Sequence, residues 1–316
     1  MRHVFVINPD AGRGNARQEV EGCLAQYAGS DAVEVHVTAT AREAADYIRA
    51  TRGRVSGPLR FYACGGDGTL NAVVNAAWGL PDVAVGCYPS GSGNDYVKYY
   101  GGIDAFLDLE RQLAGEAVPV DLMQVNGLVA INMVHFGLDS RVAQTMERVR
   151  RWPLLGGKNA YPTGVASALL QPLGHRCTVW AGDERLNDDK LLLCTIACGQ
   201  YVGGSYRAAP RSDNADGLLD VCLVKPLSRM RLAPLMNAYK QGTHLEDPRI
   251  QRELVYRRAT RVRIRPQGEF VVLLDGELHH VDETEVRVLP SALSFVVPKG
   301  IEVKTNPAPL DKRRTA

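Results

Sequence analysis

The most informative part of the chain is RFYACGGDGTLNAVVNAA, residues 60–77. Residues 60–64 predict a strand, and three glycines around one aspartate follow it at once. Leu70, Val73, Val74 and Ala77 then recur at helical spacing. A glycine-rich turn between a strand and a helix is where open α/β sheets bind ligands, because the helix offers unpaired N–H groups there.

The chemistry of this turn indicates phosphate binding. A structural turn rarely needs three glycines and has no use for a carboxylate among them. Backbone amides suit phosphate oxygens, and a carboxylate suits a hydrated Mg²⁺ that bridges phosphates. The GxxxxGK[ST] pattern of P-loop enzymes is absent. We therefore predict a nucleotide-binding loop made of Gly65, Gly66, Asp67, Gly68 and Thr69.

Two further loops follow predicted strands. Residues 8–15 follow the strand-like Val4–Ile7, and two glycines let the backbone approach a ligand, although an ordinary turn explains the loop equally well. Arg17 stands where a dinucleotide fingerprint needs its third glycine. Residues 89–96 follow Val83–Tyr88 and end in an Asn-Asp-Tyr run, with a polar turn as the alternative. We add residues from these two loops, and one at the end of the strand-like Val33–Val37, to the predicted nucleotide-binding set. They are Asn8, Pro9, Gly12, Gly14, Thr38, Ser92, Asn94 and Asp95.

The order of predicted elements divides the chain. Strands and helices alternate through the first part, including a helix over residues 15–27 and another capped by Thr40, which indicates a parallel sheet covered by helices. From about Val118, strand-like runs follow one another and indicate a mainly antiparallel β domain, interrupted by helices near Val142–Val149 and Leu232–Gln241. We predict an α/β nucleotide-binding domain at 1–120, a β domain at 121–304 and a polar, basic tail at 305–316.

Composition excludes several classes of protein. A formal charge of +2 over 316 residues does not suit a nucleic-acid binder, so anionic ligands must be held by local sites. The seven cysteines form no CxxC pair and lie mostly in apolar runs, which predicts buried, reduced thiols and a reducing compartment. We see no signal peptide and no apolar run of membrane-spanning length, and we expect a cytoplasmic protein.

Together, the three loops resemble the catalytic domain of the diacylglycerol kinase family, which includes bacterial lipid kinases and the sphingosine and ceramide kinases. The family patterns NPxxGxG, GGDGT and PxGTxND are matched with one change, Ser92 for threonine. The resemblance implies a nucleotide-binding domain like that of NAD kinases and phosphofructokinases, then a β-sandwich lipid domain, with the active site in the cleft between. It rests on residues 8–14, 65–69, 89–95, 132–140, 203–221 and 275–277.

The same resemblance implies the reaction and its base. ATP would give its γ-phosphoryl group to a hydroxyl of diacylglycerol or a related lipid, with Mg²⁺. Asp275 or Glu277 would accept the hydroxyl proton. We favour Asp275, because the following glycine lets a substrate approach closely. The alternative is a plain hairpin, since Asp-Gly is a common type I′ pair.

Two metal sites follow from the resemblance. Asp67, with Asp95, would hold the catalytic Mg²⁺. A second, structural Mg²⁺ would take the Asp216 carboxylate and the backbone carbonyls of Asp213 and Leu218, because hard cations prefer oxygen ligands. A metal-free turn is the alternative for the second site.

Two basic segments leave membrane contact open. Arg257–Arg265 is either a solvated strand face or a surface for anionic lipid. Arg148–Leu155 mixes cations with tryptophan and leucines, which fits a membrane interface or a helix end on the core. A lipid substrate would bring the protein to the inner face of the membrane, and the resemblance also suggests a homodimer.

Two other functions stay open. The GGDGT loop also occurs in NAD kinases and resembles a loop of phosphofructokinases, so a soluble acceptor is the rival enzyme. A catalytically inactive lipid- or nucleotide-binding module is the rival of another class. The chain keeps Asp67, Asp95, Asp275 and Glu277, which favours an active kinase.

Overall fold

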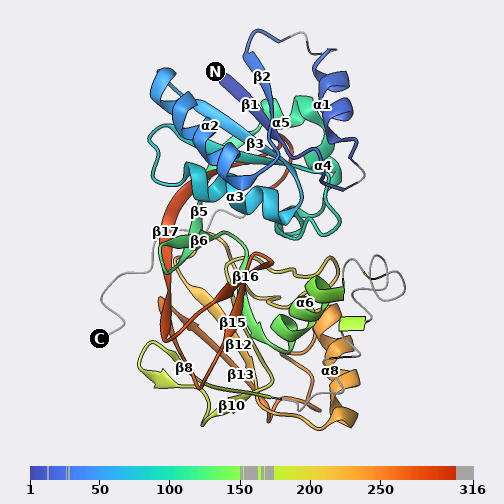
Figure 1. The fold of residues 1–316 in the computed structure, drawn as a ribbon, viewed down its shortest axis with the longest axis vertical. Helices are drawn as coiled ribbons and strands as arrows, with labels where there is room; N and C mark the ends of the chain where they lie inside the picture. The colour runs from blue at the N-terminus through green and yellow to red at the C-terminus, as the bar shows by residue number, and fades with distance from the viewer. Residues whose placement is uncertain are drawn as a thin grey trace. The chain divides into compact units, whose positions relative to one another are not determined.

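The computed structural model (Figure 1) describes residues 1–12, 14–25, 27, 29–149, 152, 163–164, 167 and 174–303. Two compact units are present. The first consists of residues 1–122, 213–218 and 289 onward, and the second of residues 123–212 and 219–288. The chain therefore passes between the units at four places. The sequence placed residues 213–218 and 289–304 in the second domain, because no local pattern shows that a segment leaves its domain and returns.

The first unit is built on a parallel sheet, in the order β17-β4-β3-β1-β2. Every strand predicted in this part is present. The central strands are nearly continuous apolar runs, as expected when helices cover both faces of a sheet. The bounds are β1 Arg2–Ile7, β2 Ala32–Val37, β3 Leu59–Gly65, β4 Val83–Pro89 and, at the edge, the last part of β17 Thr284–Val297.

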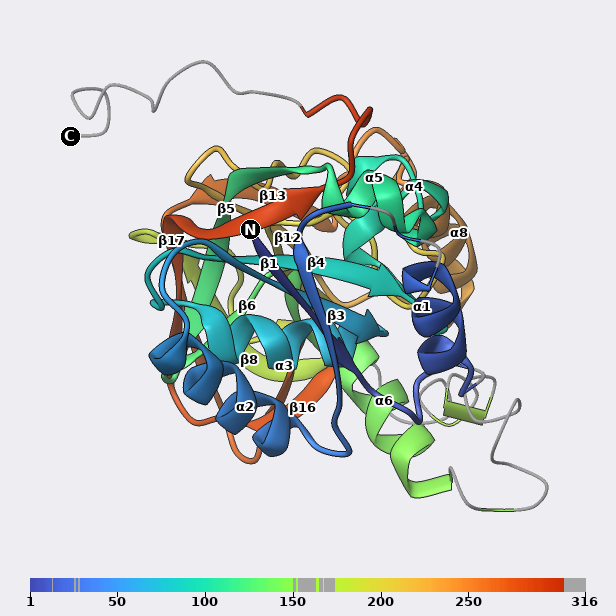
Figure 2. The ribbon, with the colours of Figure 1, turned by 90° about the horizontal axis from the view of Figure 1, so that it is seen from above.

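Helices lie on both faces of this sheet (Figure 2). One face carries α2 (Ala41–Arg54) and α3 (Asp67–Ala77). Thr40 caps α2 as predicted, since its hydroxyl accepts the Glu43 N–H at 3.1 Å. The other face carries α1, α4 and α5, and a 3₁₀ helix, η1, follows β4. Their bounds are α1 Ala16–Leu24, η1 Tyr96–Tyr100, α4 Asp104–Leu107 and α5 Leu109–Leu113.

The second unit is a sandwich of two antiparallel sheets. The first sheet has the order β13-β12-β11-β7-β15-β16. The second joins β10, β8 and β14 to the start of β17, with β9 beside β8 and β6 beside the end of β5. The bounds are β5 Glu116–Val125, β6 Leu128–Ala130, β7 Met133–Gly137, β8 His175–Ala181, β9 Glu184–Arg185, β10 Lys190–Leu191, β11 Leu193–Ala197, β12 Leu219–Val224, β13 Leu254–Ala259, β14 Arg261–Pro266, β15 Val271–Leu274 and β16 Glu277–His280.

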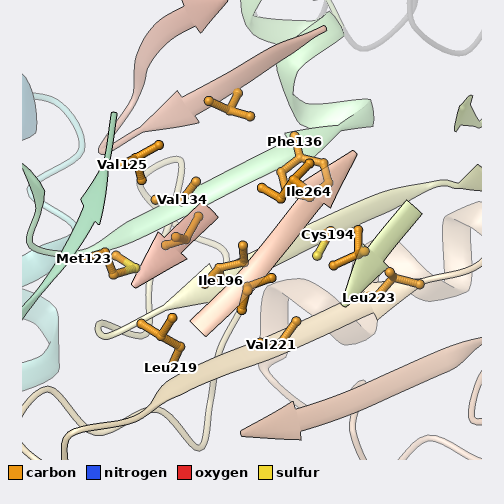
Figure 3. Packing of buried hydrophobic residues seen from close by; sticks show 14 of the residues in the cluster. Met123, Val125, Val134, Phe136, Cys194, Ile196, Leu219, Val221, Leu223 and Ile264 are labelled. Carbon is orange, nitrogen blue, oxygen red and sulfur yellow. The ribbon is translucent and has the colours of Figure 1, made fainter. Parts of the chain in front are cut away.

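The core of this unit lies between the two sheets (Figure 3). Val134, Phe136 and Ile196 of the first sheet pack in the same buried cluster as Ile264 of the second. A separate apolar cluster covers the other face of the first sheet and holds α8 (Arg229–Gln241) and the start of α6 (Leu138–Val149). Both predicted helices of this part of the chain are therefore present.

Several expectations need adjustment. Glu285–Val288 and Ser294–Val297, predicted as two strands, belong to one long strand, β17. Pro290 and Ser291 form an irregularity between them, and Ser291 has a positive φ of 52°. All seven cysteines are free and six are buried, but Cys23 on α1 is exposed. The tail 305–316 and most of Arg148–Leu155 lie outside the described residues. Within the part of the chain that is described, no helix is long and apolar enough to cross a membrane.

Candidate functional site

Three loops meet at the carboxyl ends of β1, β3 and β4, backbone against backbone. A Cβ atom on Gly12 would lie 1.8 Å from the carbonyl oxygen of Ser90, and Gly12 has a φ of +61°. A Cβ atom on Gly91 would lie 2.3 Å from the Cα atom of Gly66. No other residue type fits these positions without moving the backbone. The three motifs that the sequence singled out therefore form one surface in the first unit.

Two carboxylates face the same small space within this surface. Asp67 is the first residue of α3, and its Oδ1 accepts the Asp95 N–H at 2.6 Å. A Cβ atom on Gly93 would lie 2.5 Å from Asp67 Oδ2 and 3.4 Å from Asp95 Oδ2. The Lys98 ammonium donates to Asp95 Oδ1 at 2.7 Å and balances part of the charge. Two carboxylate oxygens beside the N-terminus of a helix suit a hydrated cation that bridges phosphates.

The remaining predicted nucleotide-binding residues have different roles. Asn8 donates to the Thr69 hydroxyl at 3.2 Å and so links the first loop to the second. Asn94 has a φ of +53° and bonds Gly91 through both side-chain atoms, which closes the third loop. Thr38 is buried, and its hydroxyl donates to the Thr40 carbonyl at 2.9 Å, so it supports the start of α2. Ser92 is exposed, and Pro9 and Gly14 lie in the first loop.

The predicted catalytic pair lies in the second unit, on the β15–β16 hairpin. Asp275 and Gly276 have φ values of 47° and 93°, which gives the type I′ turn that the sequence left open. Asp275 is 7% exposed, and its carboxylate accepts three backbone N–H groups, from Ile131 at 2.8 Å, Asn132 at 3.0 Å and Met133 at 2.8 Å. Glu277 begins β16 and is exposed. The two carboxylates therefore have opposite environments.

Asn132 extends the Asp275 network. Its side-chain amide donates to the Tyr201 carbonyl at 2.9 Å, and its backbone carbonyl accepts the N–H groups of Cys198 and Gly199. A Cβ atom on Gly199 would lie 1.9 Å from Asn132 Oδ1, so glycine is required there. Asn132 thus ties the hairpin turn to the loop after β11. Sequence reasoning quoted Asn132 only as part of a motif and missed this role.

The Asp213–Leu218 segment belongs to the first unit and is tightly folded. Asp213 Oδ1 accepts the Ala215 N–H and Asp216 Oδ1 accepts the Leu218 N–H, each at 3.0 Å. Asp121, at 1% exposure, accepts the Gly217 N–H at 2.6 Å, and burial raises the pKa of its carboxyl. Sequence reasoning missed Asp121, which no local pattern marks. Among the described residues, no group of three or more His, Cys, Asp or Glu side chains forms a metal cluster.

The basic run Arg257–Arg265 is a salt-bridged, solvated face. Arg257 pairs with Glu184 at 2.7 Å, Arg261 with Asp183 at 2.8 Å and Arg265 with Glu283 at 2.9 Å. The Arg263 guanidinium lies over the Trp180 ring, 4.4 Å from its centroid. Carboxylates on neighbouring strands and turns thus offset this run, which favours the solvated alternative over a lipid-binding surface.

Comparison with known proteins covers nearly the whole chain. Residues 2–125 match the diacylglycerol kinase catalytic domain, and residues 132–297 match the YegS C-terminal NAD kinase beta sandwich-like domain. A diacylglycerol kinase of Bacillus subtilis (strain 168) is 26% identical over 304 residues, 93% of this chain and 96% of that protein. The "Probable lipid kinase YegS" of Escherichia coli (strain SMS-3-5 / SECEC) is 29% identical over 274 residues, 84% of this chain and 86% of that protein.

A solved structure shows the same fold. The crystal structure of a diacylglycerol kinase from Bacillus anthracis str. Sterne superposes with a TM-score of 0.69 at 18% identity, over 95% of this chain and 98% of that chain. Together with the two domain matches, this confirms the predicted α/β domain followed by an antiparallel β-sandwich.

Proposed function

Because the chain belongs to the diacylglycerol kinase family and is a lipid kinase, we propose that it moves the γ-phosphoryl group of ATP to a hydroxyl of diacylglycerol or a related lipid alcohol, with Mg²⁺. The observation that carries the proposal is the pair of carboxylates, Asp67 and Asp95, which face one space beside Gly93 among three glycine loops. This donor set fits a cation bound through one or two carboxylates and substrate phosphates.

In this proposal the first unit binds and orients the nucleotide. The loop amides and the N-terminus of α3 receive the phosphate oxygens, where the helix dipole favours negative charge. Asp67 and Asp95 would hold Mg²⁺, which would supply positive charge to neutralise the transferring group. Lys98, 2.7 Å from Asp95, supplies a further positive charge at the same place. Phosphoryl transfer depends mainly on such positioning and neutralisation.

We assign the general base to Glu277, which reverses the preference that the sequence suggested. A base must offer a lone pair to the substrate hydroxyl. Asp275 directs both carboxylate oxygens at backbone N–H groups of residues 131–133, whereas Glu277 is exposed. The lipid hydroxyl loses its proton to Glu277, its oxygen bonds to the γ-phosphorus, and ADP leaves. Asp275 holds the hairpin that carries Glu277 and acts as a positioning residue.

The second metal site stays part of the proposal. Asp216 and the carbonyls of Asp213 and Leu218 would hold a structural Mg²⁺ in the first unit. The segment is already folded by its own side chains, through the Asp213 and Asp216 turns and the Asp121 carboxylate. A cation there would add to the stability of a formed turn.

The test is a phosphorylation assay on purified Asp67→Ala with an acceptor panel. Removing a group that neutralises transition-state charge lowers the rate by roughly 10²–10³-fold. Asp46→Ala, an exposed aspartate on α2, is the matched control and keeps the wild-type rate. Diacylglycerol, monoacylglycerol, sphingosine, ceramide and NAD are compared side by side. Turnover on NAD but on no lipid, or full activity of Asp67→Ala, would refute the proposal.

A further inference from the structure

Asn214 makes a buried connection within the first unit that the proposed chemistry does not yet use. It lies in the segment 213–218, which this unit takes from the later part of the chain. Its side chain is 3% exposed, and its amide nitrogen donates to the hydroxyls of Tyr96 at 2.9 Å and Tyr100 at 2.8 Å. A side-chain amide has two N–H hydrogens, so these two hydroxyls use both. The Asn214 carbonyl accepts the Asp121 N–H at 2.7 Å, which fixes its backbone.

The two hydroxyls belong to the two ends of one short element. Tyr96 and Tyr100 are the first and last residues of η1. Both rings are buried against Phe295, with centroids 5.0 Å away in an edge-on contact for Tyr96 and 5.7 Å away in a stacked contact for Tyr100. Phe295 thus sets the planes of the rings, and Asn214 sets where their hydroxyls point. Together they fix both ends of η1.

The element that Asn214 fixes carries two charged groups of the candidate site. Asp95 is the residue immediately before η1, and Lys98 lies within it. The Lys98 ammonium contacts Asp95 Oδ1 at 2.7 Å, and the Asp95 N–H donates to Asp67 Oδ1 at 2.6 Å. A rotation or shift of η1 would therefore move the Asp95 carboxylate and the Lys98 ammonium together. It would also change the contact with Asp67.

Packing alone does not explain the choice of polar groups. Phenylalanine at both tyrosine positions and leucine at position 214 would fill a similar volume without burying three polar groups. Such apolar replacements are often neutral or stabilising. A fully bonded polar group, in contrast, has one favoured geometry, because displacement breaks directional bonds between buried groups. The amide and hydroxyls are therefore suited to fixing direction.

We propose that Asn214 is a positioning residue for phosphoryl transfer: through Tyr96 and Tyr100 it sets the direction in which Asp95 and Lys98 meet the cation and phosphates of Mg·ATP. The inference rests on the proposed function for its reaction. It assigns to the 213–218 segment a role in nucleotide binding that is separate from the Mg²⁺ ligands proposed there.

Two variants separate positioning from stability. Asn214→Leu removes the two hydrogen bonds that the amide donates to the buried Tyr96 and Tyr100 hydroxyls. The triple variant Tyr96→Phe, Tyr100→Phe, Asn214→Leu replaces the whole network with apolar groups and recovers the lost stability. The matched control is Asn187→Leu in the second unit, a buried asparagine whose amide also donates twice, to the carbonyls of Cys177 at 2.7 Å and Lys190 at 3.1 Å.

Each protein is measured in three ways: the Mg·ATP concentration for half-maximal phosphorylation, calorimetric affinity for Mg·ADP, and melting temperature. We expect both position-214 variants to need roughly tenfold more Mg·ATP, because small misplacements of reacting groups have large effects. The KM for the lipid stays unchanged. Asn187→Leu lowers the melting temperature and leaves Mg·ATP dependence as in the wild type.

Two outcomes would overturn the inference. One is wild-type Mg·ATP dependence in the triple variant, which would mean that packing alone orients η1. The other is an Asn214→Leu variant that only melts earlier, as Asn187→Leu does. If the wild-type protein phosphorylates no lipid, the proposed function fails, yet Mg·ADP affinity still tests the role of Asn214.

Discussion

Replacing Asp275 by asparagine should destabilise the second unit and only secondarily slow the reaction. The Asp275 carboxylate accepts N–H groups from Ile131, Asn132 and Met133. An asparagine side chain has one acceptor oxygen, so its NH₂ group must face at least one of these donors. The loss of a hydrogen bond to a charged group is worth ~1.5–3 kcal/mol, and the unsatisfied N–H adds ~1–3 kcal/mol. We expect a loss of about 2.5–6 kcal/mol in the free energy of unfolding, by the same estimates.

Glu277→Gln should have the opposite effect to Asp275→Asn, a slow reaction with little change in stability. Glu277 is exposed, so its substitution should change the free energy of unfolding by less than ~0.5 kcal/mol. It should lower the phosphorylation rate by about 10²–10⁴-fold, the usual effect of losing a general base. The Asp275→Asn protein should lose only roughly tenfold per folded molecule, because its hairpin still carries Glu277 in a less fixed position.

The assay pairs guanidinium unfolding with transfer of labelled phosphate from ATP to diacylglycerol, corrected for the folded fraction. An Asp275→Asn protein as stable as the wild type would refute the argument from its three hydrogen bonds. A fast Glu277→Gln protein beside a stable but ~10²-fold slower Asp275→Asn protein would return the base to Asp275.

Three further expectations concern the loops, the metal and pH. Gly12→Ala should abolish Mg·ATP binding in calorimetry, because its Cβ would lie 1.8 Å from the Ser90 carbonyl oxygen. We expect Mg²⁺ to raise the melting temperature of the wild type and Asp216→Ala to lose this rise, by linkage between binding and folding; an equal rise in both proteins would exclude that ligand. Burial lowers the pKa of His244 to about 4. Between that pH and ~6.5 the folded state therefore binds fewer protons than the unfolded state. The free energy of unfolding should fall by up to ~3 kcal/mol as the pH drops through this window. His244→Gln should flatten this part of the pH–stability curve.

The sequence predicts those parts of the site that depend on neighbours in the chain. Gly65–Thr69 and the two other loops can be recognised from their glycines, because glycine is needed wherever backbones touch or φ is positive. The pairing of Lys98 with Asp95 could also have been predicted, because residues three positions apart on a helical turn are neighbours. In the same way, the alternation of strands and helices was sufficient for the α/β unit.

The rest depends on contacts between distant residues. The direction of Asp275 is set by N–H groups of residues 131–133, far away in sequence, so the Asp-Gly-Glu pattern could not show which carboxylate turns inward. Asp121 likewise meets its partners, Gly217 and Ser291, only in the folded chain. The continuity of β17 was hidden by Pro290, which usually interrupts a strand but here stands at an irregular position.

The repeated passage of the chain between its two units limits how the protein can be cut or recombined. A fragment that ends at residue 122 would leave β4 without its neighbour β17 and Asp121 without the Gly217 and Ser291 amides. Such a fragment should aggregate through the apolar edge of β4. Chimeras that exchange the second unit with that of a relative therefore need grafts of residues 123–212 and 219–288 only, with 213–218 and the end of β17 kept from the parent that supplies the glycine loops.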